Sequence, residues 1–244
     1  MDIKIPYTPR KHQAHLHKQI DKHRWNVLVC HRRFGKTVCM INHLIRSALL
    51  SKLKNPRFAY IAPTFKQAKS IAWDYMKQFT AKIPHTKFNE TELRVDLPNG
   101  SRITLLGSES PDGLRGIYLD GCVIDEYANV NSKLFPEIIR PALSDRKGYC
   151  VFIGTPMGMN NNFYELYQHA QGAEDWFNYK AKASDTKIVD NDELVKAKEV
   201  MGEKKYQQEF ECDWIANIEG AVYGDVIAKL DDDKQLTRVP YDPA

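Results

Sequence analysis

Long hydrophobic runs and closely spaced cysteines are both missing from this sequence. No stretch approaches the roughly 20 apolar residues that a membrane-spanning helix needs, and the first residues, MDIKI, lack the apolar segment of a secretion signal. The five cysteines are scattered without the paired spacing of zinc ligands, and three of them lie inside apolar runs. These absences predict a soluble, cytoplasmic protein whose cysteines are reduced and buried.

A strong excess of one charge is also missing. The 35 lysines and arginines outnumber the 31 acidic residues by only four. This balance is compatible with a polyanionic partner, but it is far below that of a protein that binds DNA by electrostatics alone. The 244 residues, 43% of them hydrophobic, suffice for one globular domain with an appendage.

Short apolar runs alternate with longer amphipathic ones, which is typical of parallel strands joined by crossover helices. A different pattern, with strict alternation on both sides of Pro98-Asn99-Gly100, predicts an antiparallel hairpin between residues 88 and 106. We therefore predict an α/β fold with a mainly parallel central sheet, flanking helices and an added hairpin. The expected strands are 25–30, 58–62, 121–125 and 149–154, and the expected helices are 36–50, 66–79, 134–143, 163–171 and 192–201.

The segment CHRRFGKT, residues 30–37, has the context of a phosphate-binding loop, because it follows an apolar strand and opens a helix. Such a loop cradles phosphate with backbone N–H groups at the helix start. The expected nucleotide-binding residues are Arg32, Arg33, Phe34, Gly35, Lys36 and Thr37.

Within this loop, Lys36 would reach the terminal phosphates of the nucleotide, and Thr37 would hold a Mg²⁺ ion. The first glycine of the usual pattern is missing, since Cys30 stands in its place. A small residue suffices there if its φ stays negative. The alternative is an ordinary basic surface loop.

Two adjacent carboxylates, Asp125 and Glu126, end the apolar run that starts at Gly121. Strand alternation points neighbouring side chains in different directions, so one carboxylate can face a metal and the other a water molecule. We expect Asp125 to help hold Mg²⁺ and Glu126 to activate the water that attacks the γ-phosphate of ATP. The alternative is a strand that ends in two solvated acids.

Further segments, in this order, resemble the ATPase part of phage terminase large subunits. They are residues 7–13 (YTPRKHQ), 61–68 (IAPTFKQA), 113–116 (GLRG), 153–158 (IGTPMG) and 206–214 (YQQEFECDW). The resemblance implies a P-loop NTPase of the ASCE type, which has an additional strand and a catalytic glutamate. The strand before Thr155 would then lie between the loop strand and the Asp125 strand.

The same resemblance assigns roles to four other residues. Gln13 would bind the adenine edge, Thr155 would sense the γ-phosphate, and Arg33 would sense phosphate from within the loop. Arg115 would be an arginine finger that reaches the nucleotide of a neighbouring subunit. The alternatives are a helix cap for Gln13, a simple turn at Thr155, and a surface ion pair between Arg115 and Asp112.

The resemblance implies an enzyme that hydrolyses ATP with Mg²⁺ and pumps double-stranded DNA into a viral procapsid. Its expected partners are the portal protein and the small terminase subunit, with a homo-oligomeric ring on the procapsid and a monomer when alone. The host cytoplasm is the expected location. We expect a motor domain over residues 1–230, with a lid or linker subregion from about 176, and then a linker over 231–244 toward an absent nuclease domain.

Two other functions fit the same motifs. A helicase-like translocase shares Gln13, the loop and the acidic pair, although helicases usually carry a second motor lobe. A nucleic-acid-binding module that does not hydrolyse ATP is the other alternative, if Cys30 has disabled the loop. His31 is not an expected catalytic group, because phosphoryl transfer depends on positioning and charge neutralisation.

Overall fold

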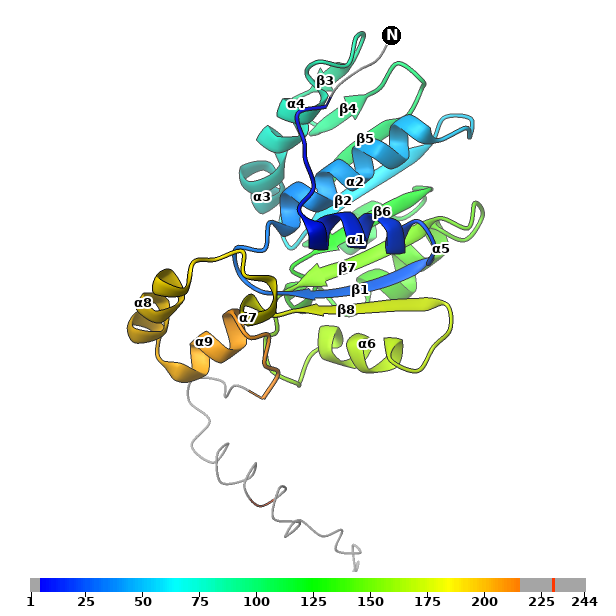
Figure 1. Ribbon diagram of the computed structural model, residues 1–244. Coiled ribbons are helices and arrows are strands. Elements are labelled where there is room, and N and C mark those ends of the chain that lie inside the picture. Colours follow the sequence, from blue (N-terminus) through cyan, green and yellow to red (C-terminus); the bar gives the residue numbers. More distant parts are fainter. Residues whose placement is uncertain (1–4, 216–229, 231–244) are drawn as a thin grey trace, which may run out of the picture.

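The computed structural model describes residues 5–215 and 230, and within them one twisted sheet of eight strands forms the centre (Figure 1). The strand order is β3-β4-β5-β2-β6-β7-β1-β8. The strands are β1 Trp25–Cys30, β2 Arg57–Ala62, β3 Lys87–Asn89, β4 Arg94–Asp96, β5 Arg102–Gly107, β6 Gly121–Asp125, β7 Tyr149–Gly154 and β8 Trp176–Ala181.

The direction of the strands confirms the predicted fold class. Neighbours from β5 to β8 in this order pair in parallel, whereas β4 pairs antiparallel with both β3 and β5. The predicted hairpin is therefore present as β4 and β5, and β5 also pairs in parallel with β2. Strand β7 lies between β1 and β6, as the ASCE arrangement requires. This order places the carboxyl ends of the parallel strands β1, β6 and β7 side by side.

Side chains of each central strand alternate between two hydrophobic cores. On β1, Leu28 and Cys30 face the core under helices α1 (Lys11–Ile20) and α2 (Lys36–Leu50). Val27 and Val29 face the opposite core. There they pack with helix α6 (Asn162–Ala170). Burial on both faces explains why these strands are continuous apolar runs in the sequence.

Two of the expected helices are interrupted. The first divides into α3 (Phe65–Ala68), a π-helical turn (Lys69–Trp73) and α4 (Asp74–Thr80). The second divides into a π-helical turn (Leu134–Ile139) and α5 (Arg140–Ala142). Pro136 and Pro141 lie in this second segment, and proline removes the N–H groups that a regular helix uses. Short 3-10 turns cover Pro111–Leu114 and Tyr127–Asn129.

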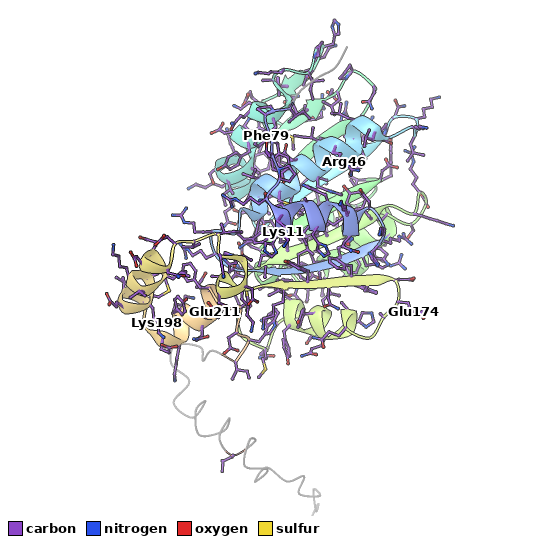
Figure 2. All side chains as sticks on the ribbon, viewed as in Figure 1. Lys11, Arg46, Phe79, Glu174, Lys198 and Glu211 are labelled. Atoms are coloured by element: carbon purple, nitrogen blue, oxygen red, sulfur yellow. The ribbon has the colours of Figure 1, made fainter. Side chains whose placement is uncertain are left out.

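Three helices after β8 form what we call the helical extension, labelled at the left of Figure 1. They are α7 (Ala183–Thr186), α8 (Asn191–Met201) and α9 (Glu203–Glu209). Lys198 and Glu211 mark this part of the chain in Figure 2. The lid or linker subregion expected from about residue 176 thus includes β8, a sheet strand that the sequence analysis did not predict. The linker expected at 231–244 lies outside the described residues.

The cysteines have the surroundings that the sequence predicts. All five are free thiols, and all five are buried. Among the described residues, no helix is both long and apolar enough to span a membrane.

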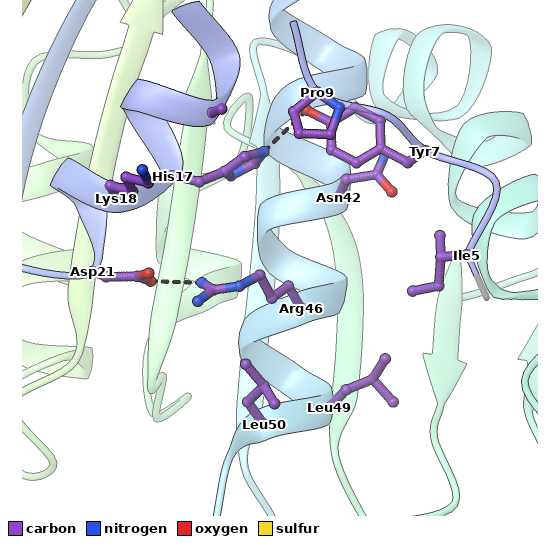
Figure 3. A pocket seen from close by; sticks show the side chains of 11 residues that line it. Ile5, Tyr7, Pro9, His17, Lys18, Asp21, Asn42, Arg46, Leu49 and Leu50 are labelled. Atoms are coloured by element: carbon purple, nitrogen blue, oxygen red, sulfur yellow. Dashed lines mark hydrogen bonds and ion pairs between the residues drawn. The ribbon is translucent and has the colours of Figure 1, made fainter. Parts of the chain in front are cut away.

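A pocket of about 510 Å³ lies between α1, the N-terminal segment and the C-terminal half of α2 (Figure 3). At one side of it the Tyr7 hydroxyl lies 3.0 Å from His17 Nε2, and His17 Nδ1 lies 3.0 Å from His43 Nδ1. The two imidazole rings stack with their centroids 5.3 Å apart. One proton between the two Nδ1 atoms fits this geometry, and burial favours the neutral form of both rings.

We expect acid to unfold the protein partly through this histidine pair. Burial lowers the pKa of His17 to about 4 and of His43 to about 3, from about 6.5 in the unfolded chain. Their contribution to stability is therefore complete above pH 6.5 and is lost as the pH falls toward 4 and 3. Between pH 6.5 and the lowered pKa, each buried ring reduces the free energy of unfolding by up to about 1.4 kcal/mol for each pH unit of acidification.

Chemical denaturation at a series of pH values measures this slope. His43→Gln should flatten it, because glutamine can hydrogen-bond but does not titrate. His15→Gln, the same change at an exposed position of α1 outside this pair, is the control and should leave the slope unchanged. An equal slope in His43→Gln and the unaltered protein would contradict the assignment.

Candidate nucleotide-binding site

The loop between β1 and α2 takes its shape from two residues in the left-handed backbone region. Arg33 has φ 70° and Gly35 has φ 86°. A Cβ atom on Gly35 would also lie 3.0 Å from the Gln13 side chain, so glycine suits this position in both respects. Cys30 is not among the described residues with positive φ. The cysteine in place of the first glycine is therefore compatible with this loop, as expected from the sequence.

Helix α2 begins at Lys36 with Gly35 as its N-cap, and its first turn contains no acidic residue. The first amides of a helix have no acceptor within the helix, and the helix dipole adds partial positive charge at this end. The loop and the start of α2 are therefore suited to bind an anion.

The Lys36 ammonium group connects the ends of three strands. It donates to the Thr155 hydroxyl after β7 at 2.9 Å and to the Cys30 carbonyl of β1 at 3.4 Å. It also lies 3.8 Å from a carboxylate oxygen of Glu126, directly after β6. Only 12% of the Lys36 side chain is exposed, so these oxygens supply the partners that a desolvated ammonium needs. The structure thus brings together three residues that are far apart in the sequence.

The two adjacent acids point in different directions, as predicted. Asp125 ends β6 and is 5% exposed. Glu126 has a left-handed backbone with φ 47° and ψ 48°, which turns its side chain out of the strand. Burial raises the pKa of both carboxyl groups, whereas the nearby Lys36 ammonium lowers it. A buried acid close to a fixed cation is a typical arrangement in catalytic sites.

Thr37 and Asp125 have one neighbour in common, the hydroxyl of Tyr60. The hydroxyl of Tyr60 donates a short hydrogen bond to Asp125 Oδ2, and the Thr37 side chain contacts the same tyrosine hydroxyl. Mg²⁺ prefers oxygen ligands and is commonly held by one or two protein groups together with phosphate oxygens. Among the described residues, no three His, Cys, Asp or Glu side chains gather as a metal site. The hydroxyl and carboxylate pair therefore fits a phosphate-bound Mg²⁺ rather than a metal held by protein alone.

Gln13 lies beside the loop and is only 4% exposed. Its carbonyl oxygen accepts from the Arg10 amide at the start of α1, and its NH₂ group donates to the Gly35 carbonyl at 3.3 Å. The carboxamide thus makes both a helix-capping bond and a bond to the loop. Gln13 therefore caps helix α1, which was the alternative to adenine binding, and its adenine role stays a prediction.

The remaining loop residues have different surroundings. Arg32 donates its backbone N–H to the Glu209 carbonyl of α9 at 2.8 Å, and its side chain lies 3.8 Å from the Glu209 carboxylate. Arg33 is exposed and makes no recorded polar side-chain contact within the described residues. The Phe34 ring is buried in the core beneath α1 and α2, so Phe34 can offer a ligand only its backbone.

Arg115 does not join the other predicted site residues. Its guanidinium is 58% exposed and lies 2.8 Å from Asp112 and 3.7 Å from Glu137. The surface ion pair with Asp112, which was the alternative interpretation, is therefore present. A role toward a neighbouring subunit would need this guanidinium to exchange Asp112 for another anion.

Sequence reasoning missed two contributors to this site, Tyr60 and Glu209. Tyr60 lies inside an apolar strand, and no motif in the sequence indicates that β2 lies next to β6. Glu209 reaches the loop through α9, 177 residues after Arg32 along the chain. His31 is buried, and its Nε2 atom lies 2.8 Å from the Thr186 hydroxyl of α7. This contact joins the loop to the helical extension.

Comparison with known proteins agrees with this geometry. The family model described as "Terminase large subunit, T4likevirus-type, N-terminal" matches residues 29–225. The large terminase subunit of Thermus phage G20c is 30% identical over 126 residues, which is 44% of this chain and 26% of that protein. The chain thus matches about a quarter of the length of that relative.

Solved structures share the fold. The large terminase ATPase domain of Thermus phage P74-26 superposes with a TM-score of 0.73 at 21% identity, covering 86% of this chain and 95% of that domain. The large terminase of a thermophilic bacteriophage in complex with ADP gives a TM-score of 0.73 at 16% identity, covering 84% of this chain and 53% of that one. With the family model matching most of its length, the chain belongs to the family of phage terminase large subunits.

Proposed function

We propose that this domain binds and hydrolyses ATP with Mg²⁺, and that the full-length protein uses this reaction to move double-stranded DNA into a procapsid. The observation that carries the proposal is the convergence of Lys36, Thr155 and Glu126 at the start of α2. Terminase structures with bound ADP or ATP-γ-S, both from a thermophilic bacteriophage, share this fold and support a nucleotide as the ligand.

The residues of the site divide the work of hydrolysis. The amides of the loop and of the first turn of α2 bind the phosphates, and Lys36 moves from its present partners to the terminal phosphate oxygens. Glu126 orients a water molecule for attack on the γ-phosphorus and accepts its proton, while ADP leaves with the electrons of the broken P–O bond. Thr37 and Asp125 would hold Mg²⁺, which would supply positive charge opposite the phosphates.

Three further residues would report on the nucleotide. The Thr155 hydroxyl and the phosphates would compete for the Lys36 ammonium, so Thr155 can respond to the presence of the γ-phosphate. Arg33 is exposed on the loop, where it can pair with phosphate oxygens, for which its planar fork is suited. Gln13 would read the adenine edge after giving up its bond to the Gly35 carbonyl.

Family membership supports a proposal for the larger assembly. Arg115 would act as an arginine finger on the nucleotide of a neighbouring subunit, in a homo-oligomeric ring on the portal protein. The small terminase subunit would be a further partner, in the cytoplasm of the bacterial host. The motor would span residues 1–230, with 231–244 linking it to a nuclease domain.

We expect Lys36→Ala and Glu126→Ala to abolish turnover in different ways. Lys36→Ala removes charge-assisted bonds to phosphate worth about 1.5–3 kcal/mol, so ATP affinity should fall about 10- to 100-fold. Glu126→Ala should still bind ATP, while turnover falls by about 10²- to 10⁴-fold because the water-activating group is gone.

Mg²⁺-dependent phosphate release and binding of a fluorescent ATP analogue measure the two effects. Arg46→Ala is the control, since its surface pair with Asp21 lies toward the opposite end of α2 (Figure 3). If the unaltered domain binds no nucleotide, the non-hydrolysing module becomes the better interpretation. A requirement for procapsid and duplex DNA, in the full-length protein, would distinguish packaging from helicase-like translocation.

We expect Arg115→Ala to be inactive alone but to recover activity when it is mixed with Lys36→Ala. In a ring, a Lys36→Ala subunit keeps its finger and can serve the intact pocket of an Arg115→Ala neighbour. Loss of an arginine finger costs about 10³- to 10⁵-fold in known cases, so even partial recovery is measurable. Phosphate release is followed at high total protein concentration over a range of mixing ratios. Activity that never exceeds the sum of the two separate variants would rule out action between subunits.

A further inference from the structure

Tyr60 places a single hydroxyl group between the loop and the acidic pair. The residue lies on β2, next to β6 in the sheet, and is 1% exposed. Its ring packs in the core under α1 and α2, and its hydroxyl donates to Asp125 Oδ2. The Thr37 side chain lies beside the Tyr60 hydroxyl as well. The two protein groups that fit Mg²⁺ are therefore joined by one rigid side chain from a third element.

The other oxygen of Asp125 is also engaged. Asp125 Oδ1 accepts a hydrogen bond from the backbone N–H of Glu126 at 2.9 Å. With Oδ2 bonded to Tyr60, rotation of the carboxylate would break at least one of these bonds. Glu126 has a left-handed backbone that non-glycine residues seldom adopt, and the bond to Asp125 helps to hold it there. The direction of the Glu126 carboxylate thus depends on Asp125, and that of Asp125 depends on Tyr60.

We propose that Tyr60 is a positioning residue for ATP hydrolysis, which fixes the rotamer of Asp125 relative to Thr37 and, through Asp125, the backbone of Glu126. This inference rests on the proposed function. It means that the magnesium site and the water-activating carboxylate are set in place before the nucleotide binds. Groups that orient metal ligands commonly change metal affinity by about 10- to 100-fold when removed.

A purely structural role for Tyr60 makes a different prediction. If the hydroxyl only satisfies a buried carboxylate, its loss lowers stability and leaves the magnesium dependence of the folded protein unchanged. If it positions Asp125 for the metal, the loss changes the Mg²⁺ requirement of a protein that is still folded. Tyr60→Phe keeps the ring, so the packing of the core is preserved.

Tyr149→Phe is the matched control. Tyr149 is another largely buried tyrosine of the central sheet, on β7, and its hydroxyl donates to Ser47 Oγ at 3.1 Å. Both variants lose one hydroxyl from the same kind of surroundings, but only Tyr60 touches the acidic pair. Denaturant unfolding of both gives the cost of the lost hydroxyl for stability alone.

The experiment measures binding of a slowly hydrolysed ATP analogue as Mg²⁺ is varied, with a parallel titration in EDTA. We expect Tyr60→Phe to raise the Mg²⁺ midpoint by about tenfold or more, with binding in EDTA unchanged within about twofold. Its kcat should fall while the KM at saturating Mg²⁺ stays near that of the unaltered protein, because Glu126 is misdirected. Tyr149→Phe should match the unaltered protein in its Mg²⁺ midpoint, its binding in EDTA, its kcat and its KM.

A normal Mg²⁺ midpoint in Tyr60→Phe would overturn the inference and leave the proposed function standing. Absence of Mg²⁺-dependent binding in the unaltered protein would overturn both. A double-mutant cycle adds an independent check: in an Asp125→Asn background, Tyr60→Phe should have little further effect on the Mg²⁺ midpoint. Additive effects of the two substitutions would show that Tyr60 does not act through Asp125.

Discussion

The Lys36 ammonium is the interaction on which the arrangement of this site depends. It contacts the Cys30 carbonyl, the Thr155 hydroxyl and the Glu126 carboxylate, which lie at the ends of three different strands. These groups meet because β1, β7 and β6 are neighbouring parallel strands, so their carboxyl ends lie side by side. In this structure the three oxygens surround Lys36 much as phosphate oxygens would. In the proposed function, binding of a nucleotide would therefore be an exchange of partners at one cation.

The same cation also acts on the acidic pair. Burial raises the pKa of Asp125 and Glu126, and the Lys36 ammonium opposes that rise. If Lys36 turns to a phosphate as proposed, Glu126 would lose a neutralising partner at the moment when it is needed as a base. Removal of Lys36 therefore alters the acids as well as the phosphate contact. The loop also bonds to α9 through the Arg32 amide, so a change in the loop can reach the helical extension.

Local patterns predicted the loop, the four buried strands and the acidic pair, because strand burial, glycine and paired acids leave clear signals in the sequence. Contacts between distant segments could not be predicted in this way. The bonds of Tyr60 to Asp125 and of Glu209 to Arg32 depend on strand order and on the path of α9, which no short motif encodes. Strand β8 was missed because its residues are only half-buried and its polar positions hide the pattern. The roles of Arg33 and Arg115 depend on a nucleotide and a second subunit, so they stay predictions.

The most direct test of the exchange at Lys36 is a crystal structure of this domain with Mg²⁺ and a slowly hydrolysed ATP analogue. The quantity to measure is the distance from Lys36 Nζ to the Glu126 carboxylate, which is 3.8 Å here. We predict that Nζ bonds to the terminal phosphates, that this distance increases, and that Glu126 faces a water molecule beside the γ-phosphate. A nucleotide bound elsewhere, with Lys36 still joined to Thr155 and Glu126, would contradict the account.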